Sequence, residues 1–274
     1  MFKLFYIRNL LVLNQLSHRM KKYPSNLSDS QWNTILEILQ DNRKRQHDLK
    51  EIFDAIFYLL KTGCQWRMLP FNFPKWELVY YYFSKWKKDG TFELLNEIIR
   101  GKIRKKKNKN EQPSVGIIDS QSVKTTRSGA MERGFDGGKK IKGRKRHIVV
   151  DTLGLLLVVV VHSANRHDSK AAFKVLEKLN EQFYTITKVF ADGGYRGGLI
   201  GIVKQKFNLI LEVILRTDKK EQFNILPKRW IVERTFSWFE SYRRLSKDFE
   251  YQTDTAEAMI NLAMIRLMLN RIKI

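Results

Sequence analysis

KGRKRHIVVDTLGLLLVVVVHSAN, residues 142–165, is the stretch of sequence that decides the fold. Both of its halves are rich in β-branched and other apolar residues, which pack well on a pleated surface, and each has the length of a strand. The Leu153–Gly154 dipeptide between them indicates a tight turn, which favours an antiparallel hairpin. A third buried strand, VGIID at 115–119, precedes this pair. Three consecutive strands therefore form a predicted meander.

Helices and strands alternate after the meander. The expected elements are a helix capped by Asp168, a strand at 187–192, a helix near 199–207, a strand at 209–216 and a long helix through Glu233. The resulting order, β-β-β-α-β-α-β-α, is the ribonuclease H-like order of the α/β class. In that arrangement the first and fourth strands are neighbours.

The residues before the meander have a helical pattern. Ser28 and Gln31 form a capping box before the first expected helix, and three more helices are expected at about 48–62, 75–89 and 92–100. We predict a helical DNA-binding domain at 20–100, with a helix-turn-helix as one possible form and a packing or dimerisation bundle as the alternative. A basic linker is predicted at 101–114, and a catalytic domain at 115–274. Residues 1–19 are interpreted as an extension, with translation beginning at Met1 or at Met20.

Charge and composition restrict the class of partner. The 274 residues carry a formal net charge of +23, with 43% hydrophobic residues and a single cysteine, Cys64. Such a basic, foldable chain favours a polyanion, and we expect DNA. The lone cysteine excludes an internal disulfide, and no apolar run of 18 residues predicts a membrane span. We expect a bacterial, cytoplasmic, nucleoid-associated protein.

Three carboxylates define the expected chemistry. Asp119 and Asp192 each end a predicted strand, and Glu233 lies on the last predicted helix. Sites in α/β sheets form at the carboxyl ends of strands, and clustered carboxylates favour Mg²⁺, for which Mn²⁺ is the expected substitute. Two such ions would serve an in-line phosphoryl transfer. The simpler interpretation of either aspartate is a turn residue or a helix cap, and Glu240 is the reserve for the third carboxylate.

Basic side chains cluster close to these acids. The segment at 139–147 is predicted to contact DNA phosphates, against the alternative of a solvated loop, and further cations accompany Glu233. Two roles are considered for Trp238, which could stack on a base or pack in the core. The expected DNA-binding residues are Lys139, Lys140, Lys142, Arg144, Lys145, Arg146, Arg229, Arg243, Arg244 and Lys247.

With these features in place, the chain resembles a bacterial insertion-sequence DDE transposase of the insertion-sequence-five group. The segments that carry the resemblance are MKKYPSNLSDSQW, AIFYLLKTGCQWRMLP, VYYYFSKW, IIDSQSVKTT, GFDGGKKIKGRKRHIVVDTLG, ANRHDSKAA, FADGGYRG and RWIVERTFSWFESYRRLSKDFE, and they span residues 20 to about 270. The resemblance implies that Asp119, Asp192 and Glu233 are the DDE triad. It also implies Mg²⁺-dependent endonuclease cleavage at element ends and transfer of a 3′-hydroxyl to target DNA, with at least a dimer on DNA.

One part of the family pattern is missing. Related transposases often show Tyr-x2-Arg-x3-Glu-x6-Lys around the glutamate. Arg229 and Glu233 fit, whereas Leu226 stands at the tyrosine position and Glu240 at the lysine position. Two rival functions are a nuclease of the same fold that does not join strands and an inactive, transposase-derived DNA-binding protein. The terminal repeat, the target sequence, the choice between hairpin formation and simple hydrolysis and the activity of this copy are left open.

Overall fold

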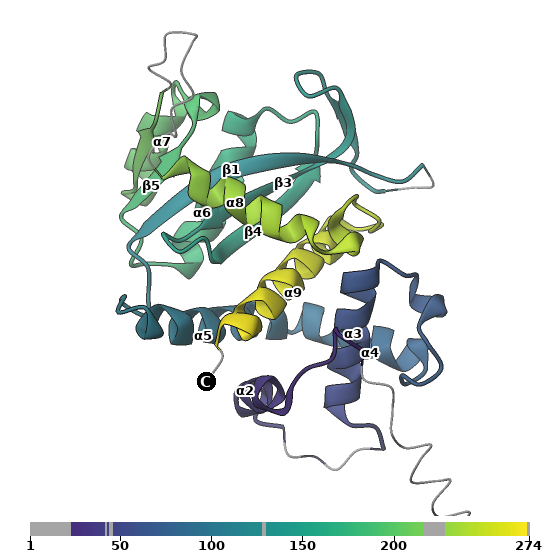
Figure 1. Ribbon diagram of the computed structural model, residues 1–274. Helices are drawn as coiled ribbons and strands as arrows, with labels where there is room; N and C mark the ends of the chain where they lie inside the picture. Colours follow the sequence, from purple (N-terminus) through teal and green to yellow (C-terminus); the bar gives the residue numbers. More distant parts are fainter. Residues whose placement is uncertain (1–22, 42, 44–45, 128–129, 216–227, 273–274) are drawn as a thin grey trace, which may run out of the picture.

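The computed structural model describes residues 23–272, apart from 42, 44–45, 128–129 and 216–227. The predicted extension at 1–19 and Leu226 therefore lie outside the described residues. The chain begins with a helical region and continues into a mixed sheet covered by helices (Figure 1). The predicted α/β class with a helical N-terminal part and a ribonuclease H-like second part is confirmed.

Four α-helices make up the described part of the first region, and local capping signals mark the ends of the first two. Ser28 accepts a hydrogen bond from the Gln31 amide while the Gln31 side chain accepts one from the Ser28 amide, so the predicted capping box is present. Gly63 ends the second of these helices in the left-handed conformation, as expected for a C-terminal cap. The elements are α2 (Asp29–Leu39), α3 (Leu49–Thr62), the short η1 (Trp66–Met68), α4 (Trp76–Lys88) and α5 (Thr91–Lys106).

An aromatic core holds this helical region together. Phe53 on α3 is fully buried and stacks on Trp86 of α4, with ring centroids 4.4 Å apart. Trp86 is therefore a core residue. The buried residues of these helices and those on one face of the sheet belong to one continuous hydrophobic cluster. The division into domains stays a prediction.

The sheet has the predicted topology. The strands are β1 (Val115–Lys124), β2 (Gly134–Asp136), β3 (Ile141–Val150), β4 (Leu156–Ser163), β5 (Lys188–Ala191) and β6 (Ile210–Val213). β1, β3 and β4 form the antiparallel meander, while β5 pairs in parallel with β1 and then with β6. The short β2, which pairs with the start of β3, is an addition to the prediction.

Helices cover both faces of this sheet, and the pleat assigns side chains to each face. α6 (Asp168–Gln182) and α7 (Leu199–Phe207) pack on one face, against Ile118 among others. α8 (Arg229–Glu240) and α9 (Thr253–Arg271) pack on the other, where Ile117 is buried. Successive residues of a strand point to opposite faces. Odd-numbered positions near Asp119 in β1 therefore face α8, and even-numbered ones face α6.

Three local predictions are corrected. α5 continues to Lys106, so residues 101–106 are helical and only the remainder of the predicted linker lies outside a helix. The N-cap of α6 is His167, one residue before the predicted cap Asp168. The predicted order of elements also stops at the helix through Glu233. In the structure, a 3-10 turn, η3 (Arg243–Leu245), and the long α9 follow that helix. α9 runs from the sheet to the helical region and packs against α5 (Figure 1).

No helix among the described residues is long and apolar enough to cross a membrane.

Candidate active site

Asp119 and Asp192 end up beside each other because of strand register. β1 and β5 pair in parallel, with Ile117 opposite Phe190. Asp119 and Asp192 each follow these partners by two residues, so the same register places them side by side where β5 ends. Neighbouring strands lie about 4.8 Å apart, which puts two carboxylates on adjacent backbones.

Each aspartate is held by a backbone amide close to it in sequence. The Ser120 amide donates to Asp119 Oδ1 at 2.7 Å. The Gly194 amide donates to Asp192 Oδ1 at 2.8 Å and starts the short η2 turn, Gly193–Tyr195. These contacts fix one oxygen of each carboxylate. A cavity of about 420 Å³ opens beside Asp192 and Arg229.

Arg229 brings Glu233 to the two aspartates. Its Nη2 lies 3.1 Å from Glu233 Oε1, one helical turn further along α8, and 3.7 Å from Asp192 Oδ2. The positive charge of the same guanidinium group favours the ionised form of Asp119, and this contribution acts to lower the pKa of Asp119. One cation thus interacts with three carboxylates from β1, the end of β5 and α8. Glu240, the reserve candidate, is the exposed last residue of α8, and the Arg229 contact is made by Glu233.

The pKa of Asp119 is raised from 3.8 to about 6. Burial is the main cause, and the negative charge of Asp192 adds to it. The Ser120 amide, Arg229 and Lys139 act in the opposite direction. A carboxylate held next to a like charge in a partly desolvated setting favours an added cation.

The three side chains suit a hard divalent cation by their chemistry, since Mg²⁺ prefers oxygen ligands. Their spacing is a separate matter. Among residues 23–272, outside the undescribed gaps, no group of three or more His, Cys, Asp or Glu side chains lies close enough to hold a metal ion. Arg229 bridges two of the acids in this arrangement. The three carboxylates therefore supply the oxygen donors that Mg²⁺ prefers, at the same end of the sheet. They are not close enough together to surround a single metal ion.

A buried polar layer lies behind Asp119, on the α6 side of the sheet. Ser120 Oγ donates to Asp168 Oδ1 at 2.9 Å, and Lys145 Nζ donates to the same oxygen at 3.0 Å. Tyr195, fully buried, hydrogen bonds through its hydroxyl to His147 Nε2 at 2.5 Å.

Burial and the nearby acids Asp119, Asp168 and Asp192 raise the pKa of the Tyr195 phenol well above its usual value. Tyr195, Asp168 and His147 are not among the site residues predicted from the sequence. The available signal was the position of Tyr195, three residues after Asp192.

Exposed cations continue outward from the acids. Lys139 Nζ donates to the Ser120 carbonyl at 3.3 Å, which places this lysine at the edge of the carboxylate cluster. Lys140 and Lys142 are exposed and line a groove of about 430 Å³ next to it. The other residues of this basic groove are Lys124, Thr125, Thr126, Arg127, Arg133 and Phe135.

Four of the predicted DNA contacts require correction, because they are buried and bonded within the protein. Arg144 has no exposed surface, and its Nη1 donates to Asp248 and to the Glu250 carbonyl. Arg146 Nη1 donates to the Leu245 carbonyl at 2.7 Å. Lys145 donates to Asp168, as described above. These side chains stabilise the fold and do not reach the solvent.

The remaining predicted contacts divide in the same way. Arg244 is the fourth buried cation, with its Nε 2.7 Å from Glu250 Oε1. Arg243 and Lys247 are exposed on and just after η3. Arg229 is half-buried among the carboxylates. Of the ten predicted DNA-binding residues, those left to face solvent without a buried role lie on the β2–β3 turn, at the start of β3 and around η3.

Sheet order, carboxylate placement and basic surroundings define the class of a DDE phosphoryl-transfer domain. The family described as "Transposase DDE domain" matches residues 110–268, and the chain belongs to this family of DDE transposases of insertion sequences. A second family, "Putative transposase of IS4/5 family", matches residues 27–96, the helical region. The resemblance inferred from the sequence is confirmed.

One curated relative supports the same assignment. The chain is similar to the "Putative transposase for insertion sequence element IS402" of Burkholderia cepacia, with 26% identity over 139 residues. The matched part is 48% of this chain and 65% of that relative's length. DDE transposases are phosphoryl-transfer enzymes that act on DNA and generally use divalent metals.

Proposed function

We propose that this chain cleaves DNA at the ends of its own insertion sequence and transfers the freed 3′-hydroxyl to target DNA. The observation that carries the proposal is the parallel pairing of β1 with β5, whose register sets Asp119 beside Asp192. The chain also belongs to a family of DDE transposases. Glu233, connected to Asp192 through Arg229, is the proposed third catalytic carboxylate. Together these residues form the proposed DDE triad.

The proposed cofactor is Mg²⁺, with Mn²⁺ as a substitute, held by Asp119 and Asp192 with Glu233 completing the site. When bound, the ions supply Lewis-acid stabilisation of the attacking and leaving oxygens in an in-line displacement. Support comes from the pKa of Asp119, which burial and, to a lesser degree, the charge of Asp192 raise, since a buried carboxylate beside a like charge favours a cation. Because Arg229 bridges two of the acids, it must release one of them as the ligand set assembles.

The residues around the triad are proposed to hold the substrate. Lys139 stands at the cluster edge, and the basic groove at 124–142 continues from it, so a DNA backbone entering the site would cross both. Arg243 and Lys247 are proposed as further phosphate contacts. Joining two element ends requires two active sites, and we therefore propose at least a dimer on DNA.

The test is cleavage and joining of a duplex that carries the element's own ends. Wild-type protein is compared with Asp192→Asn in Mg²⁺, and DNA binding is measured in parallel. We expect the wild type to cut and join, and the variant to bind with similar affinity while doing neither. Glu240→Gln serves as the matched control on α8, because Glu240 is exposed and lies two turns from Glu233.

The outcomes separate the rival functions. Cleavage without joined product would assign a nuclease. Binding without any cleavage by the wild type would assign a transposase-derived DNA-binding protein. Loss of activity in Glu240→Gln with retained activity in Glu233→Gln would move the third carboxylate to Glu240.

A further inference from the structure

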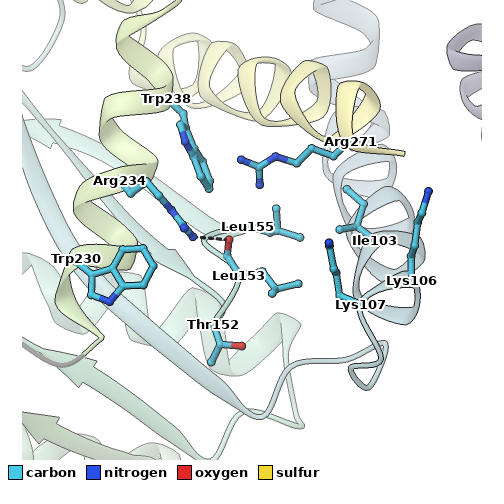
Figure 2. A pocket seen from close by; sticks show the side chains of 10 residues that line it. All are labelled: Ile103, Lys106, Lys107, Thr152, Leu153, Leu155, Trp230, Arg234, Trp238 and Arg271. Atoms are coloured by element: carbon cyan, nitrogen blue, oxygen red, sulfur yellow. Dashed lines mark hydrogen bonds between the residues drawn. The ribbon is translucent and has the colours of Figure 1, made fainter. Parts of the chain in front are cut away.

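A second pocket lies beside α8, away from the carboxylate cluster. It has a volume of about 560 Å³ and is formed by the end of α5, the turn after β3, α8 and the end of α9 (Figure 2). We call it the tryptophan–arginine pocket. Its lining includes Lys106, Lys107, Trp230, Arg234, Trp238 and Arg271.

Aromatic rings and guanidinium groups alternate along one wall. Trp230, Arg234 and Trp238 follow one another at four-residue spacing on α8, so they share a face of the helix. Arg234 lies 4.5 Å from the ring of Trp230 and 4.7 Å from that of Trp238. Arg271 of α9 lies 4.0 Å from the Trp238 ring. Stacking of this kind orients a guanidinium plane and leaves N–H groups at its edge for hydrogen bonding.

The described charged residues of the pocket are all cations. Two arginines and two lysines line it, and none of the lining residues that the structure describes is an aspartate or glutamate. Burial lowers the pKa of Arg271, and the nearby Arg234 lowers it further. Arg234 is already engaged with the Leu153 carbonyl, 3.1 Å from its Nη2. Arg271 is exposed, and no hydrogen bond to its guanidinium group is present within the described part of the chain. An anion entering the pocket would relieve the repulsion between these cations.

The pocket and the carboxylate cluster occupy different stripes of α8. Arg229 and Glu233 form one stripe, from which Arg229 contacts Asp192. Arg234 belongs to the next stripe and faces the pocket (Figure 2). The pocket therefore opens on a different side of α8 from the carboxylate cluster.

We propose that the tryptophan–arginine pocket is a second DNA-backbone site, in which Arg271 and Lys107 hold a phosphodiester. Trp230, which is 44% exposed, provides an apolar surface for the adjoining sugar or base. A backbone phosphate offers the charge and the acceptor geometry that a guanidinium fork recognises. The choice of DNA as the source of the phosphate rests on the proposed function.

The experiment measures binding of full-length protein to an element-end duplex by fluorescence anisotropy, without divalent metal, from 50 to 300 mM salt. The double variant Lys107→Ala/Arg271→Ala is compared with wild type. Because these two side chains hold one phosphodiester, losing that contact should lower the slope of log K against log salt by about 1. The matched control is Lys174→Ala/Lys204→Ala, exposed lysines on α6 and α7 over the opposite face of the sheet, and its slope should stay that of the wild type. Thermal unfolding verifies that each variant is folded.

A second arm separates DNA from a small phosphate ligand. Inorganic phosphate is titrated against wild type and the double variant, with tryptophan fluorescence as the readout and Trp230→Phe identifying the reporter. If the slope is unchanged, the proposal is overturned, and phosphate binding lost with an unchanged slope would assign a small-anion site instead. Because neither readout uses cleavage, a chain that binds through the pocket but never cuts DNA would contradict the proposed function alone.

Discussion

Arg229 Nη2 lies 3.7 Å from Asp192 Oδ2, across the space between α8 and the end of β5. The same nitrogen lies 3.1 Å from Glu233. One guanidinium group therefore connects residues 192 and 233, which are far apart in sequence and belong to separate elements. Its charge also acts on Asp119, the third member of the proposed triad.

Replacing Arg229 should change the titration of the site. Arg229 lowers the pKa of Asp119, so Arg229→Ala should raise that pKa above its present value of about 6. The acidic limb of the pH–rate profile for DNA cleavage should then move to higher pH, with a smaller movement in Arg229→Lys. Arg243→Ala, which removes an exposed arginine from η3, should leave the profile unchanged. An identical limb in Arg229→Ala and wild type would show that the guanidinium group does not tune the site.

Asp119 should reduce the stability of the fold at neutral pH. Its folded pKa of about 6 lies above its ordinary value of 3.8, so the folded state binds more protons between these values and its stability falls as pH rises through that window. Asp119→Asn should therefore raise the free energy of unfolding at pH 8 by about 3 kcal/mol, while abolishing cleavage. Below about pH 4 the gain should vanish, because both states then hold a neutral carboxyl group. Urea denaturation at pH 8 and pH 4 checks this, and a variant less stable than wild type at pH 8 would refute it.

The buried histidines should act in the opposite direction. Burial and the neighbouring His162 lower the pKa of His147 from 6.5 to about 3. Between these values the unfolded state binds the extra proton, so this group removes stability as pH falls below 6.5, by at most about 1.4 kcal/mol per pH unit. Because the Asp119 carboxyl group contributes with the opposite sign over the same pH range, the comparison is made in an Asp119→Asn background. There, His147→Gln should flatten the pH dependence of the urea midpoint between pH 6.5 and 4. If the urea midpoint depended on pH as steeply in Asp119→Asn/His147→Gln as in Asp119→Asn, the lowered pKa of His147 would be contradicted.

Two neighbouring cations of β3 should separate fold stability from DNA binding. Arg144 is buried with its Nη1 3.2 Å from Asp248 Oδ2, and removing one partner of a buried pair costs about 3–5 kcal/mol. Arg144→Ala should therefore destabilise the protein strongly. Lys142 is exposed in the basic groove, so Lys142→Ala should keep the stability and lower the salt slope of DNA binding by about 1. The reverse pattern, with a stable Arg144→Ala and an unfolded Lys142→Ala, would contradict the burial pattern of this strand.

Much of the fold was predictable because its signals are local. The β-branched runs at 142–165 and the turn at Leu153–Gly154 specify the hairpin without reference to the rest of the chain. The alternation of strand and helix patterns after it then restricts the sheet to the observed order. The position of Asp119 beside Asp192 follows from that order alone, once β1 and β5 are neighbours.

The long helix α9 was not predictable in the same way. Its buried residues lie on nearly all sides, because the helix packs against α5 and against β4. A helix enclosed in this manner has no polar face and loses the periodic signal by which helices are recognised. Only the assembled tertiary structure shows that it connects the sheet to the helical region.

The sequence by itself determined the order of the main elements from β1 to α8, the neighbouring strands and the place of the proposed triad, because each depends on patterns within short segments. The tertiary structure decided which cations are available to DNA. Arg144 and Lys142 have similar charge and lie two residues apart, yet carbonyl and carboxylate groups from residues 248–251 surround Arg144 alone. The tertiary structure also decided that Arg229 contacts both Asp192 and Glu233 and that Arg271 lies over the ring of Trp238. Such contacts depend on acceptors and rings distant in sequence, and only the folded chain brings them within reach.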